Sequence, residues 1–258
     1  MKNLLISILL VIGCVTTGPG GKKSFVLIPT DVEVEIGKDV ANEVESTEKL
    51  LSNSQVQNYV NNVGKKVAKV SDRKDVKYKF KVIDSEEINA FACPGGYIYI
   101  YSGLLKIMDN EAQLAAVLAH EVGHVVARHS MQQLQVVYGY SLLMEFALSD
   151  RLSNTAQQVV DASAGIILLG YGRENEYDSD EMGIIYEKKA GYNPNGMIQL
   201  FEKFKELEGS PPTYFEKLLS THPPAKDRIN NGKKQIQKTG GTNLPYYETE
   251  YTAIKALL

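Results

Sequence analysis

The stretch AAVLAHEVGHVVARHSM, residues 115–131, decides the fold that we expect for this chain. Within it, His120, Glu121 and His124 form an HExxH motif. On a helix, residues four positions apart lie about 40° apart around the axis and one turn apart along it, so both imidazoles can reach one metal ion. Zinc binds neutral imidazole nitrogen readily, and Glu121 can take a proton from a water molecule that zinc activates. The motif therefore predicts a helix that carries a zinc site.

The alternative is a chance pair of histidines on an ordinary helix, and the sequence around the motif argues against it. Apolar residues flank the motif, so its polar side chains would be buried and would need partners. Gly123 costs about 1 kcal/mol relative to alanine inside a helix, which indicates that another segment approaches closely there. His129 lies about 180° around a continuous helix from His120, so we expect it outside the site, at the surface or behind the ligands.

A third ligand is expected in GRENEYDSDEMG, residues 172–183, which holds five acidic side chains within eight positions. A catalytic zinc site needs three protein ligands, and the spacing HExxHxxGxxH of a third histidine is absent, so a downstream carboxylate is favoured. The run does not fit an EF-hand calcium loop beginning at Asp178. Met182 would stand at the fifth position of that loop, and Lys189 would stand at the twelfth, where glutamate is required.

A helix through this run divides its acids into two groups. The group expected to face solvent is Glu174, Asp178 and Glu181. Glu176 and Asp180 point the other way and lie one turn apart, which suits one metal ligand and one carboxylate that orients a ligating histidine. Periodicity does not say which is which. Glu187 lies on the same side, and the pattern gives it no role.

The rest of the pattern predicts a mainly helical α+β chain with a small, largely antiparallel sheet. Residues 32–71 and 195–208 have helical periodicity, and Asn110 with Gln113 predicts the start of the HExxH helix. KYKFKVID, residues 77–84, alternates as a half-buried strand does. After a Pro-Gly-Gly turn, a second alternating strand follows: Tyr97, Ile98, Tyr99, Ile100 and Tyr101.

The N-terminus MKNLLISILLVIGC, residues 1–14, predicts an export signal. Its apolar run is much shorter than the roughly 20 residues that a membrane-spanning helix needs. The VIGC sequence resembles a bacterial lipobox, which implies cleavage before Cys14 and lipidation of its thiol; the alternative is an ordinary signal peptide with a chance cysteine. Cys93 is the only other cysteine, and we expect a small, partly buried residue there.

The bulk composition limits the partners and the domains. The chain has 258 residues, a net charge of −3 and no cluster of basic residues, so nucleic acid is not an expected partner. The expected organisation is a signal peptide at 1–13, a lipidated tether at 14–31, a peptidase-type domain at 32–238 and a surface tail at 239–258.

Five segments together resemble the M48 family of zinc metallopeptidases. They are NAFACPGGYIYIYSGLL, LAHEVGHVVARHS, GRENEYDSDEMG, AGYNP and STHPPAKDRI. The segments come in the family order and cover most of residues 35–232; HEVGH alone is moderately specific, but the five together are highly specific. The chain looks most like the compact lipoprotein-type members, related to the Ste24-type and Oma1-type peptidases. The resemblance implies a zincin-like fold.

The resemblance also chooses between the two inward acids. Matched to the family pattern S-R-x-x-E-x-x-x-D, Glu176 is implied to be the third zinc ligand and Asp180 the carboxylate that supports a ligating histidine. Two positions depart from the pattern: Gly172 stands where the family often has serine, and Ser179 stands where alanine is common.

The family's His-Pro segment matches His222 and Pro223, with Arg228 in the following helix. In similar proteins this histidine can approach the zinc and restrain activity, which makes His222 a candidate fourth ligand in a latent state. The alternative is a loop histidine that caps the next helix. The implied catalytic residues are Glu121 as general base, and Arg228 or His222 as the group that stabilises the oxyanion.

These inferences predict a zinc-dependent endopeptidase of the cell envelope, with one zinc ion per chain and protein or peptide substrates. The strand at 97–101 is expected to pair with an extended substrate. The expected location is an outer membrane, facing the periplasm, or the cell surface where there is a single membrane. Exported proteins that are misfolded or misassembled are the expected substrates. The alternatives are a chaperone-like factor for outer-membrane protein assembly that rarely cleaves, and a structural zinc site.

Overall fold

The computed structural model describes residues 14–16, 23–148, 158–161, 163, 165, 170–207, 216–222 and 226–258. The predicted signal peptide at 1–13 and Pro223 lie outside the described residues. Where the chain is described, no helix is both long and apolar enough to cross a bilayer.

The described part of the chain is mainly helical. Its strands are β1 (Cys14–Thr16), β2 (Lys23–Phe25), β3 (Lys79–Ile83), β4 (Ala90–Cys93) and β5 (Tyr97–Tyr101), with a 3₁₀ turn η1 (Pro94–Gly96) before β5. Its helices are α1 (Thr30–Thr47), α2 (Ser54–Val70), α3 (Ser102–Ile107), α4 (Glu111–Ala127), α5 (His129–Leu148), α7 (Arg173–Lys189), α8 (Asn195–Leu207), α9 (Glu216–Thr221), α10 (Lys226–Thr239) and α11 (Glu248–Lys255).

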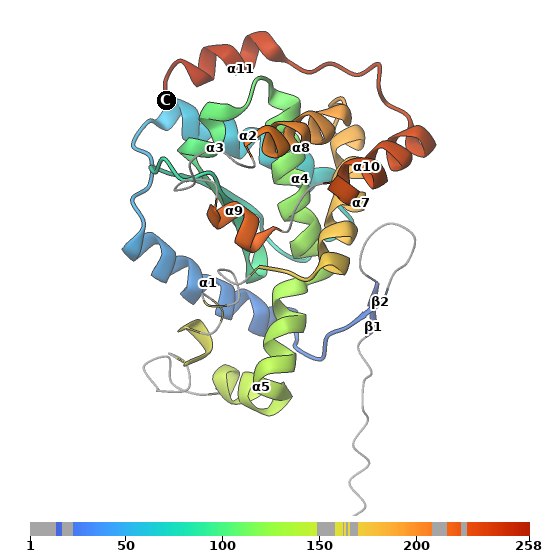
Figure 1. The fold of residues 1–258 in the computed structure, drawn as a ribbon. Helices are drawn as coiled ribbons and strands as arrows, with labels where there is room; N and C mark the ends of the chain where they lie inside the picture. The colour runs from blue at the N-terminus through green and yellow to red at the C-terminus, as the bar shows by residue number, and fades with distance from the viewer. Residues whose placement is uncertain are drawn as a thin grey trace, which may run out of the picture.

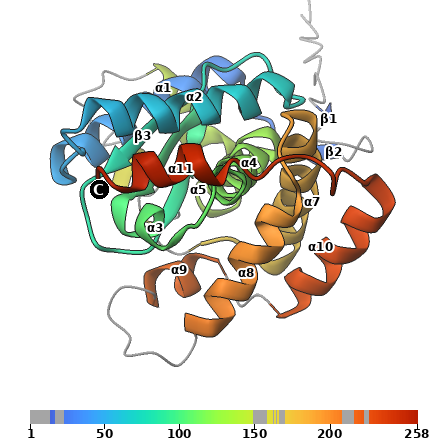
Figure 2. The same cartoon turned by 90° about the horizontal axis from the view of Figure 1, so that it is seen from above.

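The HExxH helix α4 runs through the middle of the molecule (Figure 1). Every residue of α4 is buried, as its apolar sequence requires. Seen from above, α1 and α2 lie on one side of α4, and α8 and α10 lie on the other (Figure 2). The predicted start of the helix is confirmed, because Oδ1 of Asn110 accepts a hydrogen bond from the backbone N–H of Gln113 at 3.0 Å.

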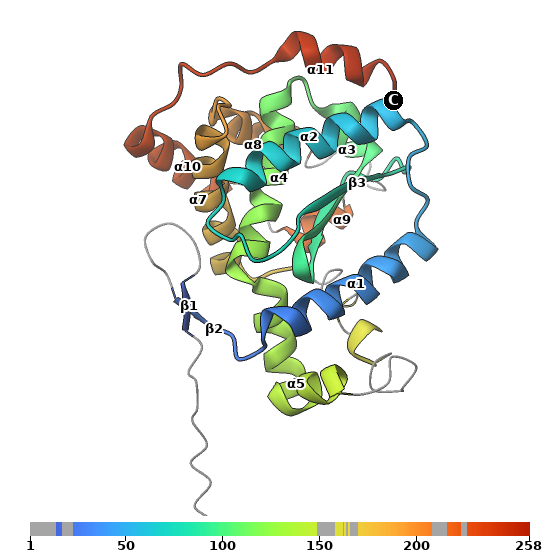
Figure 3. The same cartoon turned by 180° about the vertical axis from the view of Figure 1, so that it is seen from behind.

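The main sheet has three strands in the order β3-β5-β4, and α2 packs against β3 (Figure 3). The α+β class is confirmed, but the sheet is mixed where we expected it to be largely antiparallel. β5 pairs antiparallel with β4 and parallel with β3. The reason is the additional strand β4, which precedes the Pro94–Gly96 turn: the chain reverses twice between β3 and β5, so these two run in the same direction.

Helices α4 and α7 approach closely at two small residues. A Cβ added to Gly123 would lie 3.0 Å from Cα of Ser179. One turn along the crossing, a Cβ on Gly183 would lie 3.3 Å from the backbone N of His120. The close approach predicted from Gly123 is therefore confirmed, and it brings the acidic run of α7 beside the HExxH motif.

Residues of the expected tether and of the expected tail contribute more to the fold than the sequence indicated. The expected surface tail forms α11, in which Tyr251 is 1% exposed and donates a hydrogen bond to the carbonyl of Leu105 at 2.8 Å. Within the expected tether, Val26 and Ile28 are buried in the core. These residues pack inward because both segments contain apolar side chains, which gain free energy when they are buried.

Candidate active site

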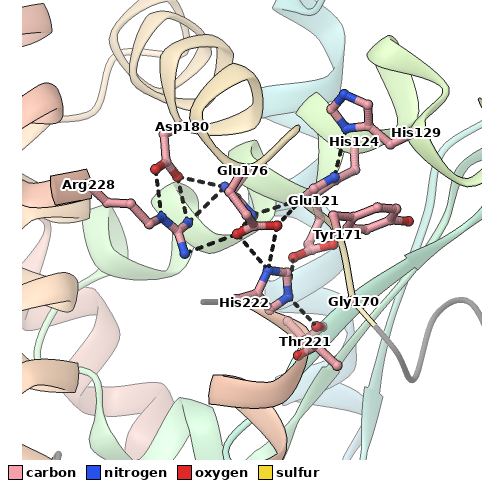
Figure 4. Close-up of polar contacts among 12 residues, drawn as sticks. Glu121, His124, His129, Gly170, Tyr171, Glu176, Asp180, Thr221, His222 and Arg228 are labelled. Atoms are coloured by element: carbon pink, nitrogen blue, oxygen red, sulfur yellow. Dashed lines mark hydrogen bonds and ion pairs between the residues drawn. The ribbon is translucent and has the colours of Figure 1, made fainter. Parts of the chain in front are cut away.

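His120, His124 and Glu176 bring their ligand atoms together at the crossing of α4 and α7. Figure 4 labels His124 and Glu176 within this cluster. The Nε2 atoms of the two imidazoles lie 3.0 Å apart. One carboxylate oxygen of Glu176 lies 3.3 Å from Nε2 of His124, and the other lies 3.5 Å from Nε2 of His120. Zinc–nitrogen bonds of about 2.0–2.1 Å in a tetrahedron place neighbouring ligand atoms about 3.3 Å apart. The three side chains therefore fit a zinc ion.

Asp180 and Arg228 hold two of these candidate ligands in place. Oδ1 of Asp180 lies 2.9 Å from Nδ1 of His120, so it can fix the orientation of that ring. Arg228, on α10, donates to both oxygens of Asp180 at 2.7 Å and lies 3.0 Å from Glu176. The structure thus places the predicted pair of acids as expected: Glu176 faces both imidazoles, and Asp180 stands behind one of them.

His222 lies in the same cluster, directly after α9. Its Nδ1 is 3.0 and 3.2 Å from the two oxygens of Glu176, and its Nε2 is 3.4 Å from the carbonyl of Ala90. One ligand atom from each of His120, His124, Glu176 and His222 lies within 4.8 Å of the others. The sequence-based expectation that His222 lies near the metal site agrees with this geometry.

Glu121 stands beside the cluster with one free oxygen. The side chain is 1% exposed, and its Oε2 has no hydrogen-bond partner among the described residues. Its Oε1 lies 3.8 Å from Nε2 of His222. Burial raises the pKa of Glu121 above its usual value. A buried carboxylate with a free oxygen is suited to accept a proton from a molecule that enters the site.

The pKa shifts of His120 and Glu176 are those expected of a site that favours a cation. Burial alone would lower the pKa of His120, but the carboxylates of Glu176 and Asp180 outweigh it and raise that pKa to about 9. Burial would raise the pKa of Glu176, but the neighbouring His222 and Arg228 hold it well below its usual range. Since a proton on His120 is stabilised by these two carboxylates, a metal cation in its place would be stabilised in the same way.

His129 is buried directly behind His124, which is one of the two expected positions; it does not lie at the surface. Its Nδ1 is 2.9 Å from Nδ1 of His124. The angle of about 180° between His120 and His129 applies to a continuous helix, but α4 ends at Ala127, and Arg128 adopts a left-handed conformation with φ of 57°. The chain turns there, and α5 begins with His129 aimed back at the ligand. Nothing in the residue pattern signalled this break, because arginine is not a residue that usually ends a helix in this way.

Tyr171 is a further residue of the site that the sequence did not reveal. Its ring stacks on the ring of His124, with centroids 4.1 Å apart and an angle of 20° between the planes. Its hydroxyl lies 2.7 Å from the hydroxyl of Ser130. It is buried just before α7.

The predicted substrate strand, Tyr97–Tyr101, cannot pair with a substrate. It forms β5, the central strand, and both of its edges already bond to β3 and β4. Among the described strands, β4 lies beside the site and pairs along one edge only, with β5. Phe91 and Ala92 of β4 line a small pocket that also includes Glu121, Tyr171 and His222. The error arose because alternation identifies a strand but not its place in the sheet.

Cys93 is a free thiol at the end of β4 and is 1% exposed. Burial raises the pKa of this thiol far above its usual value, so it is neutral and unreactive. The expectation of a small residue is confirmed, but Cys93 is fully rather than partly buried. The lipidation predicted at Cys14 stays a prediction.

One buried helix supplies two imidazoles one turn apart, with a glutamate between them, and a second helix supplies a carboxylate. These features define the class of HExxH metallopeptidases. The chain belongs to peptidase family M48, whose sequence profile matches residues 54–236, more than half of its length. The family that the motifs resembled is thereby confirmed.

Individual relatives share this region. The chain is 32% identical over 199 residues to the mitochondrial metalloendopeptidase OMA1 of Schizosaccharomyces pombe, covering 74% of this chain and 57% of that one. It is 30% identical over 224 residues to the putative beta-barrel assembly-enhancing protease of Vibrio cholerae, covering 81% and 45%. It is 27% identical over 198 residues to the metalloprotease YcaL of Escherichia coli, covering 72% and 74%. The chain thus spans about half the length of the first two.

Proposed function

We propose that this protein is a zinc-dependent endopeptidase of the cell envelope, with zinc held by His120, His124 and Glu176. The observation that carries the proposal is the convergence of three ligand atoms at 3.0, 3.3 and 3.5 Å, close to the edges of a zinc tetrahedron. When bound, zinc supplies a positive charge that polarises a peptide carbonyl and a water molecule.

Glu121 is the proposed general base. Its unpartnered Oε2 accepts the proton of the attacking water, and the same carboxyl then passes that proton to the amine nitrogen that leaves. All three nitrogens of the Arg228 guanidinium contact Glu176, Asp180 or His120, so we assign Arg228 to positioning rather than to the oxyanion. His222, whose Nε2 faces Glu121, is the better candidate to stabilise the oxyanion.

The edge of β4 that pairs with no other described strand is the proposed place for the substrate. An extended peptide added there would pair with main-chain groups beside Glu121, which suits broad sequence tolerance. The lipobox-like sequence at Cys14 and relatives named as beta-barrel assembly-enhancing proteases support an exported, lipid-anchored protein that acts on envelope proteins. Loss of membrane association and of palmitate labelling in Cys14→Ala would test the anchor.

The test of the proposed activity is Glu121→Gln, with Glu174→Gln as the matched exposed glutamate on α7. Wild type and both variants should bind one zinc ion per chain by elemental analysis. Cleavage of an unfolded protein should fall at least about 100-fold in Glu121→Gln only. Full cleavage by Glu121→Gln would refute the general-base assignment, and absence of zinc from wild type would refute the metal site.

A second candidate function is a latent peptidase that mainly assists the assembly of outer-membrane proteins. His222 favours it, because this side chain contacts Glu176 and the carbonyl of Ala90, on the strand where a substrate would pair. Under this function, His222→Ala should raise the resting rate of cleavage. Rescue of an assembly defect in cells by Glu121→Gln as well as by wild type, with no cleavage by either, would favour the assembly role over the peptidase.

A further inference from the structure

The two candidate histidine ligands are oriented by different kinds of partner. Nδ1 of His120 faces the carboxylate of Asp180 at 2.9 Å. Nδ1 of His124 instead faces another imidazole, Nδ1 of His129, at 2.9 Å. His129 is 2% exposed, so water does not readily take its place. Figure 4 shows the two partners on opposite sides of the site.

The geometry assigns the proton in the contact between His124 and His129. Nε2 of His124 faces Nε2 of His120 and Glu176, so it is the nitrogen that would bind the metal and it must carry no proton. A neutral imidazole then has its proton on Nδ1. This N–H points at Nδ1 of His129, which must therefore be the acceptor. His129 in turn carries its own proton on Nε2.

A buried ion cluster holds the turn that aims His129. Arg128, in its left-handed conformation, places Nε 2.6 Å from Oε2 of Glu33 and donates from its terminal nitrogen to the carbonyl of Ile28 at 2.5 Å. Arg73 contacts both oxygens of the same carboxylate, at 2.8 and 2.9 Å. Helix α1 thereby anchors the junction between α4 and α5.

The same turn also supports the stacking of Tyr171 on His124. Ser130, the residue after His129, lies within hydrogen-bond distance of the Tyr171 hydroxyl. The ring of Tyr171 lies nearly parallel to that of His124. Tyr171 thus covers one face of the His124 ring, and Ser130 contacts the hydroxyl of Tyr171. His129 contacts Nδ1 of the same ring.

We infer that His129 is a positioning residue of the metal centre: it accepts a hydrogen bond from Nδ1–H of His124 and fixes the tautomer and ring orientation in which His124 binds zinc. This inference rests on the zinc site proposed above. Partners that orient ligating histidines typically change metal affinity by 10–100-fold when they are removed.

The test compares His129→Asn with His129→Leu. Oδ1 of asparagine stands where Nδ1 of histidine stood and can accept the hydrogen bond, whereas leucine has a similar shape and no acceptor. Zinc affinity, measured by competition with a chromophoric chelator, should fall about 10–100-fold in His129→Leu and stay within a few-fold of wild type in His129→Asn. The visible spectrum of the cobalt-substituted protein should change in the leucine variant only. Circular dichroism of the metal-free proteins reports on folding.

Nitrogen NMR of histidine-labelled, zinc-loaded wild type tests the tautomer without any substitution at position 129. The inference requires His129 to be neutral with its proton on Nε2, and His124 to carry its proton on Nδ1. An Nδ1–H tautomer of His129, or equal loss of zinc affinity in both variants, would overturn it. So would wild-type affinity in a folded His129→Leu. Wild type that binds no zinc would instead overturn the zinc site itself, and the inference with it.

Discussion

Glu187 is a fully buried glutamate whose neutral form should dominate in the folded protein, and this has a measurable consequence for stability. It is 0% exposed, and neither of its oxygens has a hydrogen-bond partner among the described residues. It lies on the buried side of α7 beyond the candidate ligands, with Oε1 against Gly196 at the start of α8. Burial raises the pKa of Glu187 well above its usual value.

The sign and size of the effect follow from this shift. Below about pH 4.5 the carboxyl is protonated in both the folded and the unfolded chain, so it adds no pH dependence. Above that pH only the unfolded chain releases the proton, and the free energy of unfolding falls by about 1.4 kcal/mol per pH unit until the folded pKa is reached. Glu187→Gln removes this loss, so the variant should exceed wild type at pH 6 by up to about 2 kcal/mol, or up to about 4–8 °C in Tm.

Urea unfolding of both proteins at pH 4, 5 and 6, in the same metal-free state, measures this difference. Glu174→Gln, an exposed glutamate on the same helix, is the matched control and should follow wild type at each pH. A difference between Glu187→Gln and wild type that does not grow with pH would refute the reasoning. So would a wild type that is the more stable protein at pH 6.

Three further predictions concern the candidate metal site and the helices packed around it. Glu176→Gln should weaken zinc binding far more than Asp178→Asn on the same helix; equal losses in a chelator competition would contradict the ligand assignment. Gly123→Leu should lower the free energy of unfolding by at least about 1–3 kcal/mol, because the leucine side chain must enter the space that Ser179 occupies. The same variant should also bind zinc more weakly. Tyr251→Phe should cost about 1 kcal/mol by losing one buried hydrogen bond, and Tyr251→Ala about 3–5 kcal/mol, measured by urea unfolding; no loss in Tyr251→Ala would show that α11 is dispensable.

The part of the site that local periodicity governs could be predicted from the sequence. His120 and His124 stand one helical turn apart, so their convergence needs only the helix itself. The inward direction of Glu176 and Asp180 follows from the same angle, and both are buried as expected. Their order, with Glu176 at the imidazoles and Asp180 behind, depends on how α7 crosses α4. Periodicity carries no information on that crossing, and the family resemblance supplied it.

The features that the sequence did not predict depend on single backbone changes or on pairing between distant segments. His129 joins the site because Arg128 adopts a left-handed conformation, which a distant partner, Glu33, helps to hold. The Tyr97–Tyr101 strand has the alternation of a sheet strand, but its central place depends on the short strand β4 pairing beside it. Neither the residue pattern nor the propensities of these segments specify such long-range contacts.

Metal binding and helix packing share one stripe of α7. Glu176, Ser179, Asp180 and Gly183 are spaced by three, one and three residues, so they lie on one face of the helix. Because Ser179 and Gly183 are small, the backbones of α4 and α7 approach closely. At this short separation Asp180 contacts His120, and Glu176 contacts both His120 and His124. A larger side chain on this stripe would move the carboxylates away from the imidazoles even if every ligand were kept. Acidic and small residues that share one face of a helix therefore indicate such a site when the same sequence contains an HExxH motif with a glycine.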